Sequence, residues 1–158
     1  MNSHHTVAIG TWEGDKQQSI EYNSSIAVGI DCPRAKLRVS ILLDTIQECQ
    51  VRYIFSDEEI SEAVNEAGLI IGARGIAYEG VLQRKPVIVV GEYGFGGLVT
   101  PDTLHEQYNN YFRGKINGIK AEYFSLERLE EEIRRGFALT FQELQMMSNQ
   151  TIRFLHNI

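Results

Sequence analysis

The segment covering residues 69–91 reads LIIGARGIAYEGVLQRKPVIVVG, and its pattern decides the expected fold. Two continuous apolar runs, 69–72 and 87–90, enclose a stretch with helical character over 76–84. Unalternating apolar runs of this length are typical of strands covered on both faces, as in a parallel sheet. Pro86 ends the helix, because its ring disfavours helical geometry in the preceding residue. The segment therefore predicts a strand–helix–strand unit.

Further elements extend this unit in both directions. The runs 7–10, 25–30 and 51–55 are rich in β-branched residues and predict strands, whereas the polar stretch 14–25 predicts a loop. The order β-α-β-α-β-α-β followed by helices is typical of layered α/β proteins with right-handed crossovers. We therefore expect an α/β fold: a Rossmann-like, doubly wound, mostly parallel sheet with C-terminal helices. One domain should span residues 1–158.

The expected helices have recognisable ends. Ser56 with Glu59 three residues later is a capping box, and Gly68 stands where a C-terminal cap is expected. Thr100 precedes Pro101 and an acidic residue, which predicts the start of a helix that ends at Gly114. The other helices are expected over 34–49, from 126 to a stop at Gly136, and over 141–155.

Composition narrows the class of protein. The chain has 158 residues, of which 43% are hydrophobic and 23% charged, as in ordinary globular domains. Its formal charge of −6 argues against nucleic acid as the main partner, because phosphates require a basic face. Cys32 and Cys49 are too few for a disulfide framework or a zinc site and are expected to be reduced thiols. No apolar stretch reaches membrane-spanning length and no leader pattern opens the chain, so a cytoplasmic protein without a metal is expected.

Two glycine-dense turns carry the functional expectation. Half of the 14 glycines lie between residues 72 and 97, in the segments that follow the apolar runs 69–72 and 87–90. Ligands of parallel sheets bind beyond the carboxyl ends of the strands, and glycine lets backbone amides approach an anion. One such turn alone would be explained by a tight connection, but two at the same edge favour a ligand site.

Two charged residues stand in these turns. Glu79 has a carboxylate that can accept hydrogen bonds from two adjacent hydroxyls of a ribose, or can simply complement a helix dipole. Arg74 can face a phosphate with its planar guanidinium group or remain a solvated cation. The residues alone leave both alternatives open.

The string from Ala73 to Val89, followed by Gly94-Phe-Gly-Gly-Leu-Val-Thr-Pro101, resembles the C-terminal half of GT-B-fold glycosyltransferases. That family has a small-residue loop, a helix with Glu-Ala, a Gly-Lys-Pro-Val-Ile strand and a glycine-rich loop. The resemblance implies a domain that binds a nucleoside diphosphate sugar as donor, with Glu79 on the ribose hydroxyls and the glycine-rich backbone around the diphosphate or sugar. The implied binding residues are Arg74, Gly75, Glu79, Gly94, Phe95, Gly96, Gly97 and Leu98.

The sequence also departs from the family pattern. Glu-Ala is Glu79-Gly80, Gly-Lys-Pro is Arg84-Lys85-Pro86, and Ile71 stands where retaining members often have a second glutamate. Lys16 is the nearest candidate for the basic residue that usually neutralises the diphosphate.

The family places its two substrates between two such halves, and this chain corresponds to one. Donor binding is therefore expected, with transfer only if a partner chain supplies the acceptor half; a homodimer is also expected, since the apolar stripe over 141–155 needs a surface to cover. Alternatives are a non-catalytic interaction or assembly domain on the same scaffold, and a sugar-nucleotide enzyme of the epimerase or hydrolase type.

Overall fold

A five-stranded sheet forms the centre of the molecule in a computed structural model, which describes residues 4–5, 22–23, 25–46, 49–115, 119–120 and 123–156. Four strands are parallel in the order β4-β3-β5-β6, and β7 joins β6 antiparallel at one edge. The strands of this sheet are β3 (Ser25–Gly29), β4 (Gln50–Tyr53), β5 (Leu69–Gly72), β6 (Val87–Gly91) and β7 (Gly94–Leu98), and β1 (His4–His5) pairs antiparallel with β2 (Tyr22–Asn23) in a separate ladder.

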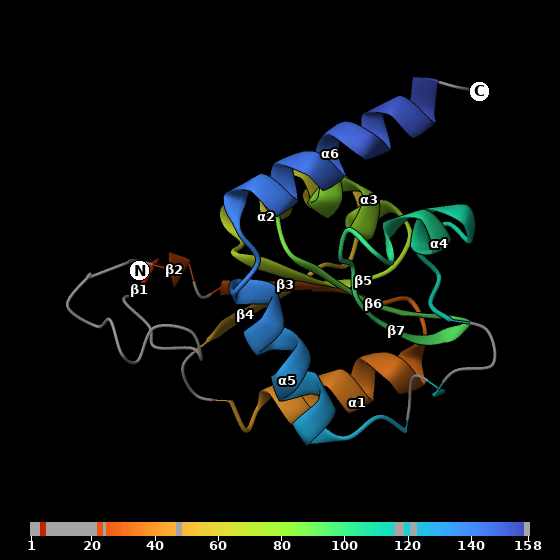
Figure 1. The fold of residues 1–158 in the computed structure, drawn as a ribbon. Coiled ribbons are helices and arrows are strands. Elements are labelled where there is room, and N and C mark those ends of the chain that lie inside the picture. Colours follow the sequence, from red (N-terminus) through yellow and green to blue (C-terminus); the bar gives the residue numbers. More distant parts are fainter. Residues whose placement is uncertain are drawn as a thin grey trace.

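Helices cover both faces of the sheet (Figure 1). On one face lie α1 and α5, and on the other lie α2, α3, α4 and α6. The helices are α1 (Pro33–Leu43), α2 (Ile60–Glu66, preceded by the 3₁₀ turn η2, Asp57–Glu59), α3 (Gly75–Leu82), α4 (Leu104–Asn109), α5 (Leu126–Phe137) and α6 (Phe141–His156). The expected doubly wound α/β architecture is confirmed. The predicted strand over 7–10 lies outside the described residues.

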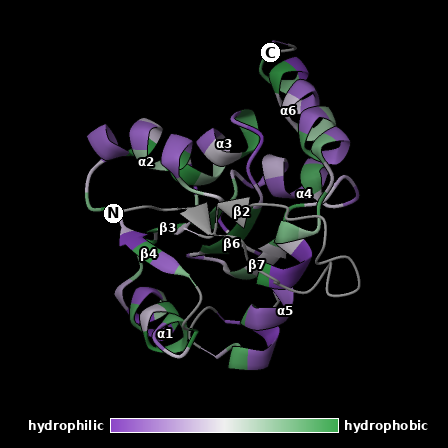
Figure 2. Ribbon diagram, turned by 90° about the vertical axis from the view of Figure 1, so that its left-hand side faces the viewer, coloured by the Kyte–Doolittle hydropathy of each residue, from purple (hydrophilic) through white to green (hydrophobic). Residues whose placement is uncertain are grey.

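Two hydrophobic cores share the strands between them. On β3, Ile26 and Val28 pack with α1 and α5, whereas Ala27 between them packs with the layer of α2 and α3. This alternation follows from the two-residue period of side chains along a strand. It explains why these strands are apolar without interruption, since neither face meets water. The helices, by contrast, alternate hydrophilic and hydrophobic residues along their lengths (Figure 2).

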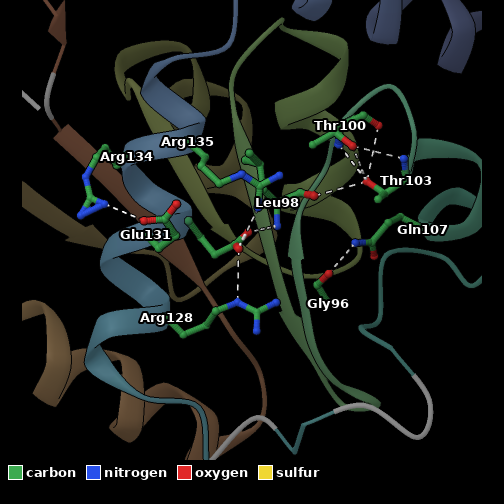
Figure 3. A network of polar contacts seen from close by, with 10 residues as sticks. Gly96, Leu98, Thr100, Thr103, Gln107, Arg128, Glu131, Arg134 and Arg135 are labelled. Atoms are coloured by element: carbon green, nitrogen blue, oxygen red, sulfur yellow. Dashed lines mark hydrogen bonds and ion pairs between the residues drawn. The ribbon is translucent and has the colours of Figure 1, made fainter. Parts of the chain in front are cut away.

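The antiparallel edge strand β7 is held from both faces by buried polar side chains (Figure 3). Glu132 of α5 is only 3% exposed, and its Oε1 accepts a hydrogen bond of 2.7 Å from the amide of Leu98. Its Oε2 lies 3.2 Å from Arg128 Nε and 3.0 Å from Arg135 Nη1. From the opposite face, Gln107 Nε2 donates to the carbonyl oxygen of Gly96 at 3.0 Å. These bonds satisfy backbone groups that a bulged hairpin would leave unpaired.

Several predicted helix ends are wrong, for local reasons. The first helix ends at Leu43 rather than near residue 49. Just beyond this end, the Thr45 hydroxyl donates a hydrogen bond to the Leu42 carbonyl oxygen. The helix expected from Thr100 begins at Leu104, because Thr100 and Thr103 bond to each other in a turn.

Of the two glycines predicted to cap helices, Gly68 does stand directly after the C-cap of α2, whereas Gly136 does not end a helix. Gly68 follows an extended Ala67 and donates to the Ser25 carbonyl oxygen. Gly136 lies inside α5, where a Cβ would stand 2.9 Å from Leu69 Cδ1. Glycine is present there because the helix approaches the sheet closely, and the helix continues to Phe137.

Replacing Glu132 tests the attachment of β7. Glu132→Ala should lower the free energy of unfolding by about 2–3 kcal/mol, because the buried Leu98 amide loses its acceptor. The matched control is Glu131→Ala on the same helix, whose exposed ion pair with Arg134 should contribute less than about 0.5 kcal/mol. Urea denaturation of both variants measures the difference, and equal effects would contradict this role of Glu132.

Candidate functional site

A cleft opens at the carboxyl edge of the sheet, where the strand order changes direction. The chain leaves β3 for β4 on one side, then crosses over β3 to β5 on the other. Such a switch point leaves a crevice between the diverging connections and is the usual ligand site of open α/β sheets. The cleft has a volume of about 300 Å³, and its walls come from the turns that follow β3, β4 and β5. Those walls include Gly29 and Asp31, then Phe55, Ser56 and Asp57, and finally Ala73, Arg74, Gly75 and Ile76.

The backbones of β3 and β5 pack closely where these strands end beneath the cleft. Gly29 and Gly72 are register partners at the ends of β3 and β5. A Cβ on Gly72 would lie 2.4 Å from the Gly29 carbonyl oxygen and 2.6 Å from Ile76 Cγ2. Glycine is therefore required at position 72 by contact with the neighbouring backbone.

Arg74 makes that turn in a strained conformation. Its φ of 57° and ψ of −124° belong to a region that glycine occupies easily and other residues rarely. Strain of this kind costs about 1–3 kcal/mol and persists only where surrounding contacts enforce it. Here the Arg74 amide donates to the Phe112 carbonyl oxygen at 3.0 Å, and the Arg74 carbonyl oxygen accepts from the Tyr78 amide at 2.9 Å.

The residues that hold this turn are themselves strained. Tyr111 and Phe112 have φ values of 63° and 54°. Phe112 is fully buried, and its ring lies 5.0 Å from that of Tyr78 in an edge-on contact. Burial and the hydrogen bond with Tyr108 raise the pKa of Tyr78 to about 12. Strained backbone collected in one place is typical of functional sites.

The Arg74 side chain takes part in an exposed ionic bridge. Its Nη2 lies 3.2 Å from Glu92 Oε1, and Arg113 Nε lies 3.8 Å from Glu92 Oε2. Arg113 Nη1 also donates to the Tyr93 hydroxyl at 3.0 Å, a bond that raises the pKa of Arg113. Because Arg74 and Glu92 are each about half exposed, their ion pair is weak and an incoming anion can compete for Arg74.

The N-terminus of α3 lies beside Arg74. The first amides of a helix have no partner within the helix and carry partial positive charge. The space at Gly75 is open, since a Cβ there would meet only Ile60 Cδ1, at 3.7 Å. A guanidinium group and helix amides thus share one wall of the cleft, an arrangement suited to a phosphate.

Glu79 lies one helical turn beyond Gly75 and is not part of the cleft wall. It is half-buried, and its Oε2 accepts a hydrogen bond of 2.7 Å from Gln83 Nε2. Gln83 in turn donates to the Ser61 carbonyl oxygen, so this side of α3 faces α2. The contact of Glu79 with a ribose stays a prediction.

The segment Gly94–Leu98 is a strand, and the prediction of a glycine-rich loop there is wrong. It pairs antiparallel with β6 from Gly91 to Ile88, and therefore runs from the carboxyl edge to the opposite edge of the sheet. Phe95 and Leu98 are each 4% exposed and belong to the core. Gly94 and Gly97 have φ values of +127° and +80°, which places the glycines in a bulged hairpin. Arg74 and Gly75 thus share the cleft, whereas Phe95, Gly96, Gly97 and Leu98 do not line it.

The cleft also contains four residues that were not predicted from the sequence: Asp31, Phe55, Ser56 and Asp57. They directly follow β3 and β4, so inspection of every turn after an apolar run would have found them. The ligand site was instead predicted in the glycine-dense segments that follow β5 and β6. The candidate Lys16 lies outside the described residues.

The described residues include no group of three His, Cys, Asp or Glu side chains placed to hold a metal ion. Over the same part of the chain, no helix is long and apolar enough to cross a membrane.

Comparisons with protein families, with curated proteins and with solved structures give no match to this chain.

Glycine at position 74 would test the strain directly. Arg74→Gly should raise the free energy of unfolding by about 1 kcal/mol, because relief of strain exceeds the conformational freedom that glycine adds to the unfolded chain. Urea denaturation measures the change. A loss of stability of similar size would mean that the arginine side chain contributes more than its backbone geometry costs.

Proposed function

We propose that the chain binds a nucleoside diphosphate sugar in the cleft at the carboxyl edge of β3, β4 and β5. The observation that carries this proposal is a strained arginine, Arg74, presented at the N-terminus of α3 inside that cleft. The guanidinium group of Arg74 and the first amides of α3 bind the diphosphate. Arg74 then exchanges its contact with Glu92 for the ligand, and Arg113 remains close to Glu92.

The overall charge of the chain supports a local and specific anion site. With a net charge of −6, the protein as a whole repels anions at long range. Binding of a diphosphate must therefore come from short-range, directional donors, which a planar guanidinium group and helix amides provide. In this proposal the chain transfers sugar only where a partner chain supplies the acceptor site.

Calorimetric titration with UDP, GDP, ADP and CDP and with UDP-glucose and GDP-mannose tests the proposal. At least one should bind, and ligand at 100 times its dissociation constant should stabilise the fold by about 2.7 kcal/mol. Arg74→Gly should weaken that binding at least about tenfold, the effect of losing a charge-assisted hydrogen bond.

The matched control is Arg84→Gly. Arg84 also has a positive φ of 62°, but it follows α3 at the end remote from the cleft. Its replacement by glycine should leave affinity unchanged. Affinity that survives in Arg74→Gly, or no binding by any of the six nucleotides, would contradict the proposal.

Failure of every nucleotide to bind would favour the alternative of an interaction domain. The outer side of α6 supports that alternative, because Phe141, Met146 and Ile152 are 68%, 50% and 41% exposed. Sedimentation velocity then distinguishes the two functions: an interaction domain that pairs with a second copy should associate as concentration rises, and Met146→Glu should reduce the association.

A further inference from the structure

We propose that the cleft selects guanine among the nucleobases, so that the donor is a guanosine diphosphate sugar. This inference rests on the proposed function, since it assigns the base end of the same cleft. The evidence for guanine comes from the turn that follows β4, where no ligand was predicted from the sequence.

Phe55 stands in that turn with its ring in solvent. At 75% exposure it is the most exposed large hydrophobic side chain in the described part of the chain, and it lines the cleft. Lys36 of α1 holds its Nζ 4.1 Å from the centre of the ring. A cation over one face leaves the opposite face to a planar partner. Nucleobases stack on exposed aromatic rings in this way, and the stacking does not depend on which base is present.

The distance between the two ends of the cleft fits a nucleoside. Arg74 follows β5 and Phe55 follows β4, and β3 lies between these two strands. Two strand spacings separate the ends, which is about 10 Å. With the diphosphate at Arg74, the ribose lies above the end of β3 and the base reaches Phe55.

Carboxylates that line the cleft favour one base over the others. Asp57 and Asp31 line the cleft and are exposed, and an ionised carboxylate accepts hydrogen bonds but donates none. The Watson–Crick edge of guanine presents two adjacent donors, its N1–H and its 2-amino group. Uracil presents a single N–H between two carbonyl oxygens, which a carboxylate repels. Adenine and cytosine each place an acceptor beside their amino group.

Asp57 is the residue assigned to the base. It comes two residues after Phe55 and begins the 3₁₀ turn η2, whereas Asp31 follows the central strand β3 and lies nearer the ribose. Ser56, between Phe55 and Asp57, turns its hydroxyl to Glu59 Oε2 at 3.2 Å. The Ser56 contact fixes the turn that presents Asp57.

The test compares diphosphates that differ in the base alone. In calorimetric titration, GDP should bind at least about tenfold more tightly than UDP, ADP or CDP, as expected for a charge-assisted hydrogen bond. Inosine diphosphate lacks only the 2-amino group of GDP and should fall between GDP and UDP. Phe55→Ala should weaken all of these ligands by about tenfold, because stacking is lost for every base.

Asp57→Asn should reduce the preference for GDP over UDP to less than about threefold, because the amide no longer provides two equivalent acceptors. The matched control is Glu58→Gln, which removes a neighbouring exposed carboxylate that does not line the cleft and should leave the preference intact. Circular dichroism checks that each variant is folded.

The outcomes distinguish the guanine assignment from diphosphate binding itself. UDP or ADP binding as tightly as GDP, or an unchanged preference in Asp57→Asn, would overturn the guanine assignment and leave diphosphate binding in place. No binding by any diphosphate would overturn both.

Discussion

The hydrogen bond from the Arg74 amide to the Phe112 carbonyl oxygen holds the geometry on which the site depends. Contact with the Gly29 backbone leaves no room for a side chain at Gly72, and two residues later the chain enters α3 through Arg74, which has a positive φ. An arginine in that conformation is unfavourable unless neighbouring groups enforce it. The buried Phe112 and the aromatic rings around it provide this enforcement, and the result is an arginine whose backbone is held at a helix N-terminus.

The hairpin of β6 and β7 determines which glycines can meet a ligand. Because β7 returns antiparallel, its residues leave the carboxyl edge and enter the sheet. Glu132 and Gln107 bind its backbone from opposite faces, and Phe95 stacks on Phe124 with ring centres 4.7 Å apart. The glycines there accommodate a bulge and close packing against Gln107, and are explained without a ligand.

The residues that line the cleft differ in charge and polarity from one end of the sheet edge to the other. Its end at β5 is cationic, through Arg74 and the helix amides, whereas its end at β4 has an exposed ring and carboxylates. Exposed charges more than about 8–10 Å apart are largely screened at physiological salt. The two ends can therefore act on different parts of one ligand, despite the acidity of the chain as a whole.

The amino-acid sequence was enough to predict the layered α/β architecture, because uninterrupted apolar runs such as those of β5 and β6 can only be covered from both faces. It also indicated that Arg74 and Gly75 stand in a turn at the carboxyl edge. Gly136 was wrongly predicted to end a helix, because glycine is needed there for a close approach to Leu69, which lies 67 positions away in the chain. The fold alone shows that Gly94–Leu98 is a strand, and that Asp31, Phe55 and Asp57 share a cleft with Arg74. Strand order and hairpin direction depend on contacts between distant segments, and these leave no local pattern in the chain.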